Sequence, residues 1–221
     1  LVSEYRYPER AVGLGVATSL TGPERVYRVT LRRPAANFGV VVTRQARGVR
    51  IEPRIVRAGD ENRLVGYTAL PFNLNPYLRI FEQPVRASGA ILPAAGAYDV
   101  VFDTPSAAAA GAFTFRYWIN DTRPPSLALR TRAVARGGDV VVTASDAGSG
   151  VDPRSVFVRV DGAERRARFA GGRIRLDTAG LARGRHVLSV QVSDYQESRN
   201  MENVAAILPN TRILRTSFTV R

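Results

Sequence analysis

The chain contains few side chains of the kinds that usually carry out catalysis. Its 221 residues include one histidine, His186, and no cysteine. All 32 basic residues are arginine, because the chain has no lysine. These counts exclude thiol catalysis, Schiff-base chemistry on lysine, zinc–thiolate centres, P-loops and any metal site that needs two histidines. An enzymatic activity would therefore depend on carboxylates or on His186.

His186 is the one residue that could serve as the base of a serine triad. It follows the turn residue Gly184 and begins an alternating run, so we expect it at the start of a strand. The Gly-x-Ser-x-Gly turn that presents the nucleophile in many hydrolases does not occur in the sequence. We therefore predict that the ring caps a turn or covers a sheet edge.

Paired carboxylates could cleave glycosidic bonds, but the acidic residues are badly spaced for this. Asp99 and Asp103 fall on one face of one expected strand, four residues apart. The strand rise then separates them by roughly 13 Å, whereas catalytic carboxylate pairs lie about 5–9.5 Å apart. We predict no catalytic residue in this chain.

A weaker pattern of oxygen-bearing side chains falls in two loops of the second half. The loops follow the second and sixth strands expected after residue 127, and these loops emerge at the same end of an immunoglobulin-like sandwich. The residues that they would bring together are Asp146, Asp152, Asp194, Glu197 and Asn200. Oxygen ligands suit calcium, so these five residues are the predicted calcium cluster; no other cofactor is indicated.

Two other interpretations of these loops stay open. Asp and Asn shape turns through side-chain-to-backbone hydrogen bonds, with Gly148 and Gly150 supplying positive φ angles. Alternatively, Arg154 or Arg199 pairs with the carboxylates. The spacing does not match an EF-hand loop.

The elements that must position these residues are expected to be strands throughout. Apolar, β-branched and aromatic runs of four to nine residues recur between Gly, Pro, Asn and Asp. In 155–161, Val156, Val158 and Val160 alternate with polar or exposed positions, as in a half-buried antiparallel strand. No segment of helical length shows a period of 3.6 residues, and the short alanine run at 107–110 is expected to be a loop or one helical turn. The predicted fold class is all-β.

A domain boundary is expected at residues 120–125, whose sequence is NDTRPP. A strong strand ends there, and two prolines stiffen the connection to a new set of strands. Each side carries enough short strands for one sandwich. We therefore predict two tandem antiparallel β-sandwiches, residues 1–122 and 123–221, the second of them immunoglobulin-like.

The net charge of +13 suggests a polyanionic partner. Residues 1–122 hold 15 arginines and 10 acidic residues, and residues 123–221 hold 17 and 9. The densest cluster comprises Arg165, Arg166 and Arg168, with Arg173 and Arg175 nearby. Aromatic residues are not interleaved with the arginines, so a nucleic-acid partner is disfavoured. No apolar run reaches the length of a membrane helix.

Nearly the whole chain resembles the region that follows the catalytic domain in bacterial, particularly actinobacterial, subtilisin-like serine proteases. The second half also resembles bacterial immunoglobulin-like repeats. The motifs that carry the resemblance to the proteases are 71–77 (PFNLNPY), 96–103 (GAYDVVFD), 113–121 (FTFRYWIND), 148–153 (GSGVDP), 184–186 (GRH), 193–203 (SDYQESRNMEN) and 207–212 (ILPNTR).

This resemblance implies a non-catalytic C-terminal accessory module of a secreted serine endopeptidase. The module would stabilise the enzyme, position a protein or polysaccharide substrate, or attach the enzyme to a surface. Its partner would be an upstream catalytic domain of the same polypeptide, and its location extracellular. No triad motif of the family occurs here, so no catalytic residue is carried over. The alternative function is an arginine-rich module that binds polyanions or cell-wall glycans.

Overall fold

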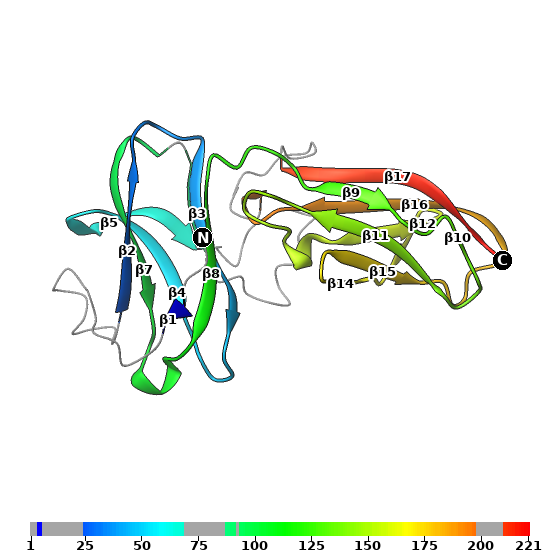
Figure 1. Ribbon diagram of the computed structural model, residues 1–221, viewed down its shortest axis with the longest axis horizontal. Coiled ribbons are helices and arrows are strands. Elements are labelled where there is room, and N and C mark those ends of the chain that lie inside the picture. Colours follow the sequence, from blue (N-terminus) through cyan, green and yellow to red (C-terminus); the bar gives the residue numbers. More distant parts are fainter. Residues whose placement is uncertain (1–3, 6–23, 69–86, 92, 198–209) are drawn as a thin grey trace. The chain divides into compact units, whose positions relative to one another are not determined.

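The structure is a computed structural model, and it describes residues 4–5, 24–68, 87–91, 93–197 and 210–221. These residues form β-strands and two short 3-10 helices, Ala107–Ala109 and Pro153–Ser155, which confirms the all-β fold class (Figure 1). The described residues divide into two compact units between Asp121 and Thr122. None of the described segments forms a helix able to cross a membrane.

The first unit is one antiparallel sheet that folds over on itself to form two layers. Its strands run in the order β1-β8-β3-β6-β5-β4-β7-β2. β5 pairs with β4 in its first part and with β6 at its end, so it connects the two layers. The strands are β1 (Glu4–Tyr5), β2 (Glu24–Leu31), β3 (Asn37–Gln45), β4 (Glu52–Arg57), β5 (Asp60–Thr68), β6 (Ala87–Ile91), β7 (Gly96–Asp103) and β8 (Phe113–Ile119).

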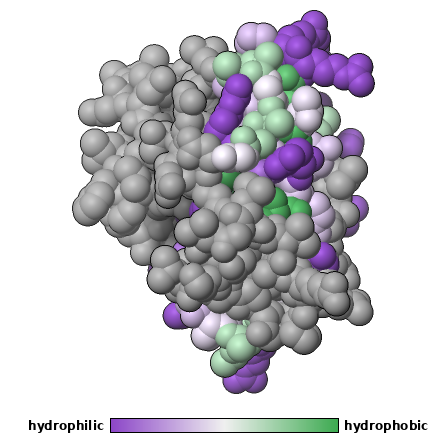
Figure 2. Space-filling model, turned by 90° about the vertical axis from the view of Figure 1, so that its left-hand side faces the viewer, coloured by the Kyte–Doolittle hydropathy of each residue, from purple (hydrophilic) through white to green (hydrophobic). Residues whose placement is uncertain are grey.

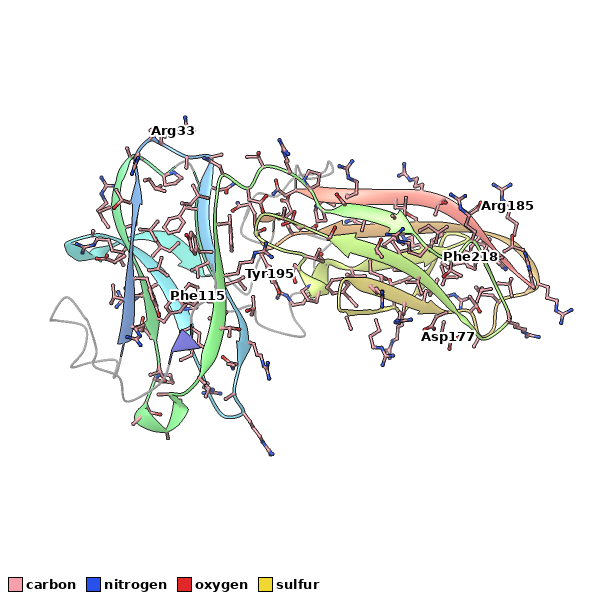
Figure 3. The ribbon with its side chains drawn as sticks, in the orientation of Figure 1. Arg33, Phe115, Asp177, Arg185, Tyr195 and Phe218 are labelled. Atoms are coloured by element: carbon pink, nitrogen blue, oxygen red, sulfur yellow. The ribbon has the colours of Figure 1, made fainter. Side chains whose placement is uncertain are left out.

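An aromatic core fills the space between these layers. The ring centroid of Phe102, on β7, lies 4.5 Å from that of Phe115 and 4.9 Å from that of Phe113, both on β8. All three side chains belong to one buried cluster, and Figure 3 labels Phe115 within it. Because β7 alternates, its other face carries Asp99 and Asp103.

The second unit is an immunoglobulin-like sandwich of two sheets. One sheet has the order β14-β15-β11-β9, and the other has the order β10-β17-β16-β12-β13. The first two strands of this unit belong to different sheets. β9 pairs with β11 in one sheet, and β10 runs parallel to β17 in the other. The strands are β9 (Ser126–Leu129), β10 (Ala133–Val134), β11 (Asp139–Ser145), β12 (Phe157–Val160), β13 (Ala163–Arg165), β14 (Arg168–Ala170), β15 (Arg173–Asp177), β16 (Gly184–Ser193) and β17 (Thr211–Val220).

The core of this sandwich follows the predicted alternation. Val158 and Val160 on β12 are buried, and Val156 packs against the same cluster. Phe218 of β17 lies in this core, as Figure 3 shows. The two tandem sandwiches predicted from the strand pattern are therefore present, each with a core of its own.

Candidate functional site

The two loops singled out by the sequence meet at one end of the second sandwich, where Figure 3 labels Tyr195. An isolated antiparallel bridge joins Val151, in the loop after β11, to Asp194, in the loop after β16. The amide of Asp152 donates to the carbonyl of Ser193 at 3.1 Å, and the amide of Tyr195 donates to that of Gly150 at 2.9 Å. We call this region the loop end; its polar side chains are Asp146, Asp152, Asp194, Glu197 and Asn210.

Asp152 is completely buried, and Arg154 neutralises its charge. Arg154 Nη2 donates to Oδ2 at 3.0 Å, while the amide and Nε of Arg154 donate to Oδ1 at 3.0 and 3.3 Å. The Arg154 side chain is itself only 9% exposed, so the pair is a buried one. Calcium would have to displace this cation to use the carboxylate. For Asp152, the structure therefore matches the alternative in which Arg154 is its partner.

Asp194 and Glu197 are also completely buried, and both accept hydrogen bonds from the ends of their loop. Asp194 Oδ1 accepts from the amide of Glu197 at 2.8 Å, and its Oδ2 accepts from Asn210 Nδ2 at 2.7 Å. Glu197 Oε2 accepts from the amide of Asn210 at 2.8 Å. The two carboxylates thus fasten the start of the loop to its last residue, which corresponds to the turn chemistry offered as an alternative to calcium.

Asp146 is a carboxylate of the loop end that comes near Asp194. Its Oδ2 accepts from the amide of Gly150 at 2.7 Å, and one oxygen of Asp146 lies within 4.8 Å of one oxygen of Asp194. Asn200, the fifth residue of the predicted cluster, lies outside the described residues. Calcium binding here stays a prediction.

Three residues of the loop end were not among the site residues predicted from the sequence. Asn210 binds both buried carboxylates, Ser155 Oγ donates to the carbonyl of Ser193 at 2.8 Å, and Ser193 Oγ lies 2.6 Å from Thr211 Oγ1. An Asn between Pro209 and a strand is a usual turn signal, and it could have marked Asn210. The serines stand in strand-like or turn-like sequence and could not have been distinguished.

His186 lies at the other end of the second sandwich, at the beginning of β16 as predicted. Ser193 lies seven positions further along the strand, which corresponds to roughly 23 Å. Figure 3 labels its neighbour Arg185 at that end. His186 and the buried serines of the loop end therefore cannot form a nucleophile–base pair.

Both ring nitrogens of His186 are engaged in hydrogen bonds. Nδ1 lies 2.6 Å from Asp161 Oδ2, and Nε2 lies 2.8 Å from the carbonyl oxygen of Ala182. A carboxylate and a carbonyl can only accept, so the ring donates from both nitrogens and is favoured as imidazolium. Phe218 stacks on the ring with centroids 5.5 Å apart. This confirms the predicted structural placement of His186 beside a turn.

These contacts move the two pKa values apart. The hydrogen bond to Asp161, followed by the one to Ala182, raises the pKa of His186. The bond from His186, followed by the one from the amide of Val187, lowers the pKa of Asp161. Asp161 itself was missed by the sequence analysis. The signal for it is the Asp161-Gly162 pair, which forms the two-residue turn between β12 and β13 with φ angles of 51° and 83°.

The carboxylates of β7 in the first unit are occupied by arginines. Arg28 donates to Asp99 through Nε at 2.9 Å and through Nη2 at 3.0 Å. Arg54 Nε donates to Asp103 Oδ2 at 2.6 Å. The two acidic residues share one face of the strand, as expected, and each serves as an ion-pair partner.

Hydrophilic side chains are dispersed over the part of the surface that Figure 2 colours. Figure 2 shows hydrophilic side chains in separate groups, with pale and green residues between them. This agrees with arginines spread along the sequence without a long basic block.

Comparisons with known proteins find solved structures that are similar to this chain. No family model matches the chain, and no curated protein matches it. A crystal structure of a DUF4785 family protein from Legionella pneumophila aligns with a TM-score of 0.30 and 12% identity. The alignment covers 100% of this chain and 64% of that one, so this chain spans about two thirds of its length. None of these comparisons connects the chain to subtilisin-like proteases, and that resemblance stays a prediction.

Proposed function

We propose that this chain is a non-catalytic module of two tandem β-sandwiches. One observation supports this most strongly: the histidine that could act as a base donates from both ring nitrogens to structural acceptors. A general base needs one nitrogen free to take a proton from a nucleophile or from water. The carboxylates of β7 and of the loop end are likewise held by arginines, backbone amides or Asn210.

The parent of this module would be a secreted subtilisin-like serine endopeptidase with its catalytic domain upstream. Support for this part comes from the sequence motifs alone, particularly 193–203 and 207–212. In that setting the module would stabilise the enzyme, position its substrate or attach it to a surface.

Labelling with a fluorophosphonate probe tests the absence of a serine-hydrolase centre. We expect the purified chain and its His186→Gln variant to take up no probe, while subtilisin, as a positive control, is labelled to completion. Labelling of the native chain that disappears in the His186→Gln variant would overturn the proposal.

The calcium prediction for the loop end is tested separately by melting the chain with millimolar calcium and with a chelator. A ligand that binds only the folded state raises the melting temperature. A rise that Asp146→Asn abolishes would support a site at Asp146 and Asp194. Equal melting temperatures would retire the prediction.

A further inference from the structure

The outer face of the sheet β14-β15-β11-β9 collects the arginines that form the densest cluster in the sequence. On β15, Ile174 and Leu176 point into the core, so the alternate residues Arg173 and Arg175 stand on the outer face. On β14, Phe169 packs against the core, so Arg168 stands on the outer face beside them.

Arg168 and Arg175 are direct cross-strand partners in the β14–β15 pair. Opposite residues on one face of an antiparallel pair have Cβ atoms about 4.5–5.5 Å apart, and like charges at that distance are destabilising. Arg168 and Arg173 form no salt bridge with any residue in the described part of the chain. Arg175 has one distant partner, Asp139, at 3.7 Å, and that carboxylate is 44% exposed. Among the described residues, Arg168 and Arg173 therefore add positive charge that no carboxylate neutralises, next to the weakly paired Arg175.

The row through Arg168 and Arg175 continues across the sheet to another arginine. Val141 of β11 is the partner of Arg175, and the amide of Arg130 donates to the carbonyl of Val141 at 2.8 Å. Leu129 packs on the core, so the exposed Arg130 that follows it stands on the outer face. The row thus spans three strand spacings, roughly 14 Å.

Small side chains surround these guanidinium groups. Arg173 lies between Ala170 on β14 and Thr143 on β11, and Val141 separates Arg175 from Arg130. The outer positions beside the arginines on these described strands are occupied by Ala170, Thr143 and Val141. The acidic residues of the face, Asp139 and Asp177, are opposite each other at one end of it, and Figure 3 labels Asp177 there. A bound anionic chain would therefore run across the strands, along the row of arginines. A chain that ran parallel to the strands would meet the negative charges of Asp139 and Asp177.

We propose that this face binds an anionic polysaccharide that lies across the strands. Its carboxylate or sulfate groups would be held by Arg168, Arg173, Arg175 and Arg130, whose planar guanidinium groups match such oxyanions. The outer positions of these four strands hold no aromatic residue on which nucleic-acid bases could stack. The proposal rests on the module function proposed above, and it names the class of surface ligand that such a module would bind.

Retention of the full chain on immobilised heparin, a sulfated polysaccharide, tests the proposal. The test variant is Arg168→Gln/Arg173→Gln/Arg175→Gln. The matched control is Arg159→Gln/Arg185→Gln/Arg215→Gln, which removes the same charge from exposed positions on the opposite sheet. We expect the test variant to bind about tenfold more weakly and to elute at lower salt, while the control elutes close to the native chain.

Two outcomes would overturn the proposal. Equal losses in both triple variants would mean that dispersed net charge causes the retention. DNA bound as tightly as heparin, with the same sensitivity to the test variant, would mean a nucleic-acid interface. Melting curves identify an unfolded variant, and we expect the test variant to melt no lower than the native chain, because it loses the repulsion between Arg168 and Arg175. Probe labelling, which tests the module function, is independent of retention.

Discussion

Buried polar side chains at the loop end of the second sandwich hold its segments together through an ion pair and hydrogen bonds. Asp152 holds a buried guanidinium, and Asp194 and Glu197 accept from amides and from Asn210. Each of these groups has lost its hydration, so its partner determines whether burial is tolerated.

Asp152→Asn should strongly destabilise the second sandwich. The substitution removes the negative charge of Asp152 from its buried pair with Arg154, whose side chain is 9% exposed, and breaking a buried ion pair typically costs about 3–5 kcal/mol. Urea unfolding of the chain measures this change. Asp139→Asn, at a surface pair, is the control and should cost less than about 1 kcal/mol. If the two variants lost similar amounts of unfolding free energy, the Asp152–Arg154 pair would not be a stabilising buried ion pair.

His186 makes the stability of the second sandwich depend on pH. Its pKa is raised, so its contribution is complete below about pH 6.5 and is lost as the pH rises through the folded-state pKa. The pKa of Asp161 is lowered, so its contribution is complete above about pH 4 and is lost as the pH falls through its folded-state value. The largest contribution from this pair therefore lies between about pH 4 and 6.5.

Urea midpoints at pH 5.5 and above pH 8 measure the effect. We expect a loss on the order of 1 kcal/mol at the higher pH, because the Asp161 side chain is 50% exposed and solvent screens the pair. His186→Gln should remove this pH dependence. A native chain that is more stable at the higher pH would contradict the assigned hydrogen bonds.

At the residue scale, the sequence predicted where a side chain lies better than it predicted which residue it contacts. His186 was expected beside a turn because Gly184 precedes it. Its partner Asp161 lies 25 residues away in sequence, and the register of β12 against β16 brings the two together. Composition and spacing do not determine that register. The same holds for Asn210, which closes the loop end from a distance of 16 residues.

At the scale of elements, cross-strand pairs determine how closely the strands approach. Gly39 on β3 is the direct partner of Trp118 on β8, and the indole covers the glycine. A Cβ at this position would overlap the indole ring. The lack of a side chain at Gly39 therefore leaves room for the indole ring of Trp118, the single tryptophan of the chain, to pack on β3.

Gly39→Ala should destabilise the first sandwich by about 1–3 kcal/mol, the usual cost of overpacking. Chemical denaturation followed by circular dichroism, a signal that does not depend on Trp118, measures it. Combining the change with Trp118→Leu, which removes the clash, should cost less than the sum of the single variants. Additive losses would show that the two residues are not coupled.

Alternating strands such as 155–161 and the short turn at 107–109 could be predicted, because periodicity and turn residues are local properties. The order of strands within each sheet could not. The crossing of β5 between two layers and the parallel pairing of β10 with β17 depend on contacts remote in sequence.

At the scale of the whole molecule, the two sandwiches have separate cores. One cluster centres on Phe102 and the other on Phe218, and each is built from residues of one unit alone. The prolines at 124 and 125 marked the boundary in the sequence, because they interrupt strand pairing. Each unit is accordingly expected to unfold cooperatively by itself.

Residues 122–221 should therefore fold alone, with a melting temperature within a few degrees of the second sandwich in the full chain. Circular dichroism and calorimetry of this fragment test the expectation. An unfolded fragment would show that the second core depends on the first unit.

The most direct test of a non-catalytic module is a turnover measurement that is independent of any one mechanism. The purified chain and His186→Gln would be incubated with casein, a peptide library and a pool of polysaccharides, and released amines and reducing ends would be counted. The structure predicts no release above the buffer blank from either protein. Release by the native chain that His186→Gln, or loss of Asp99 and Asp103, abolishes would contradict the account.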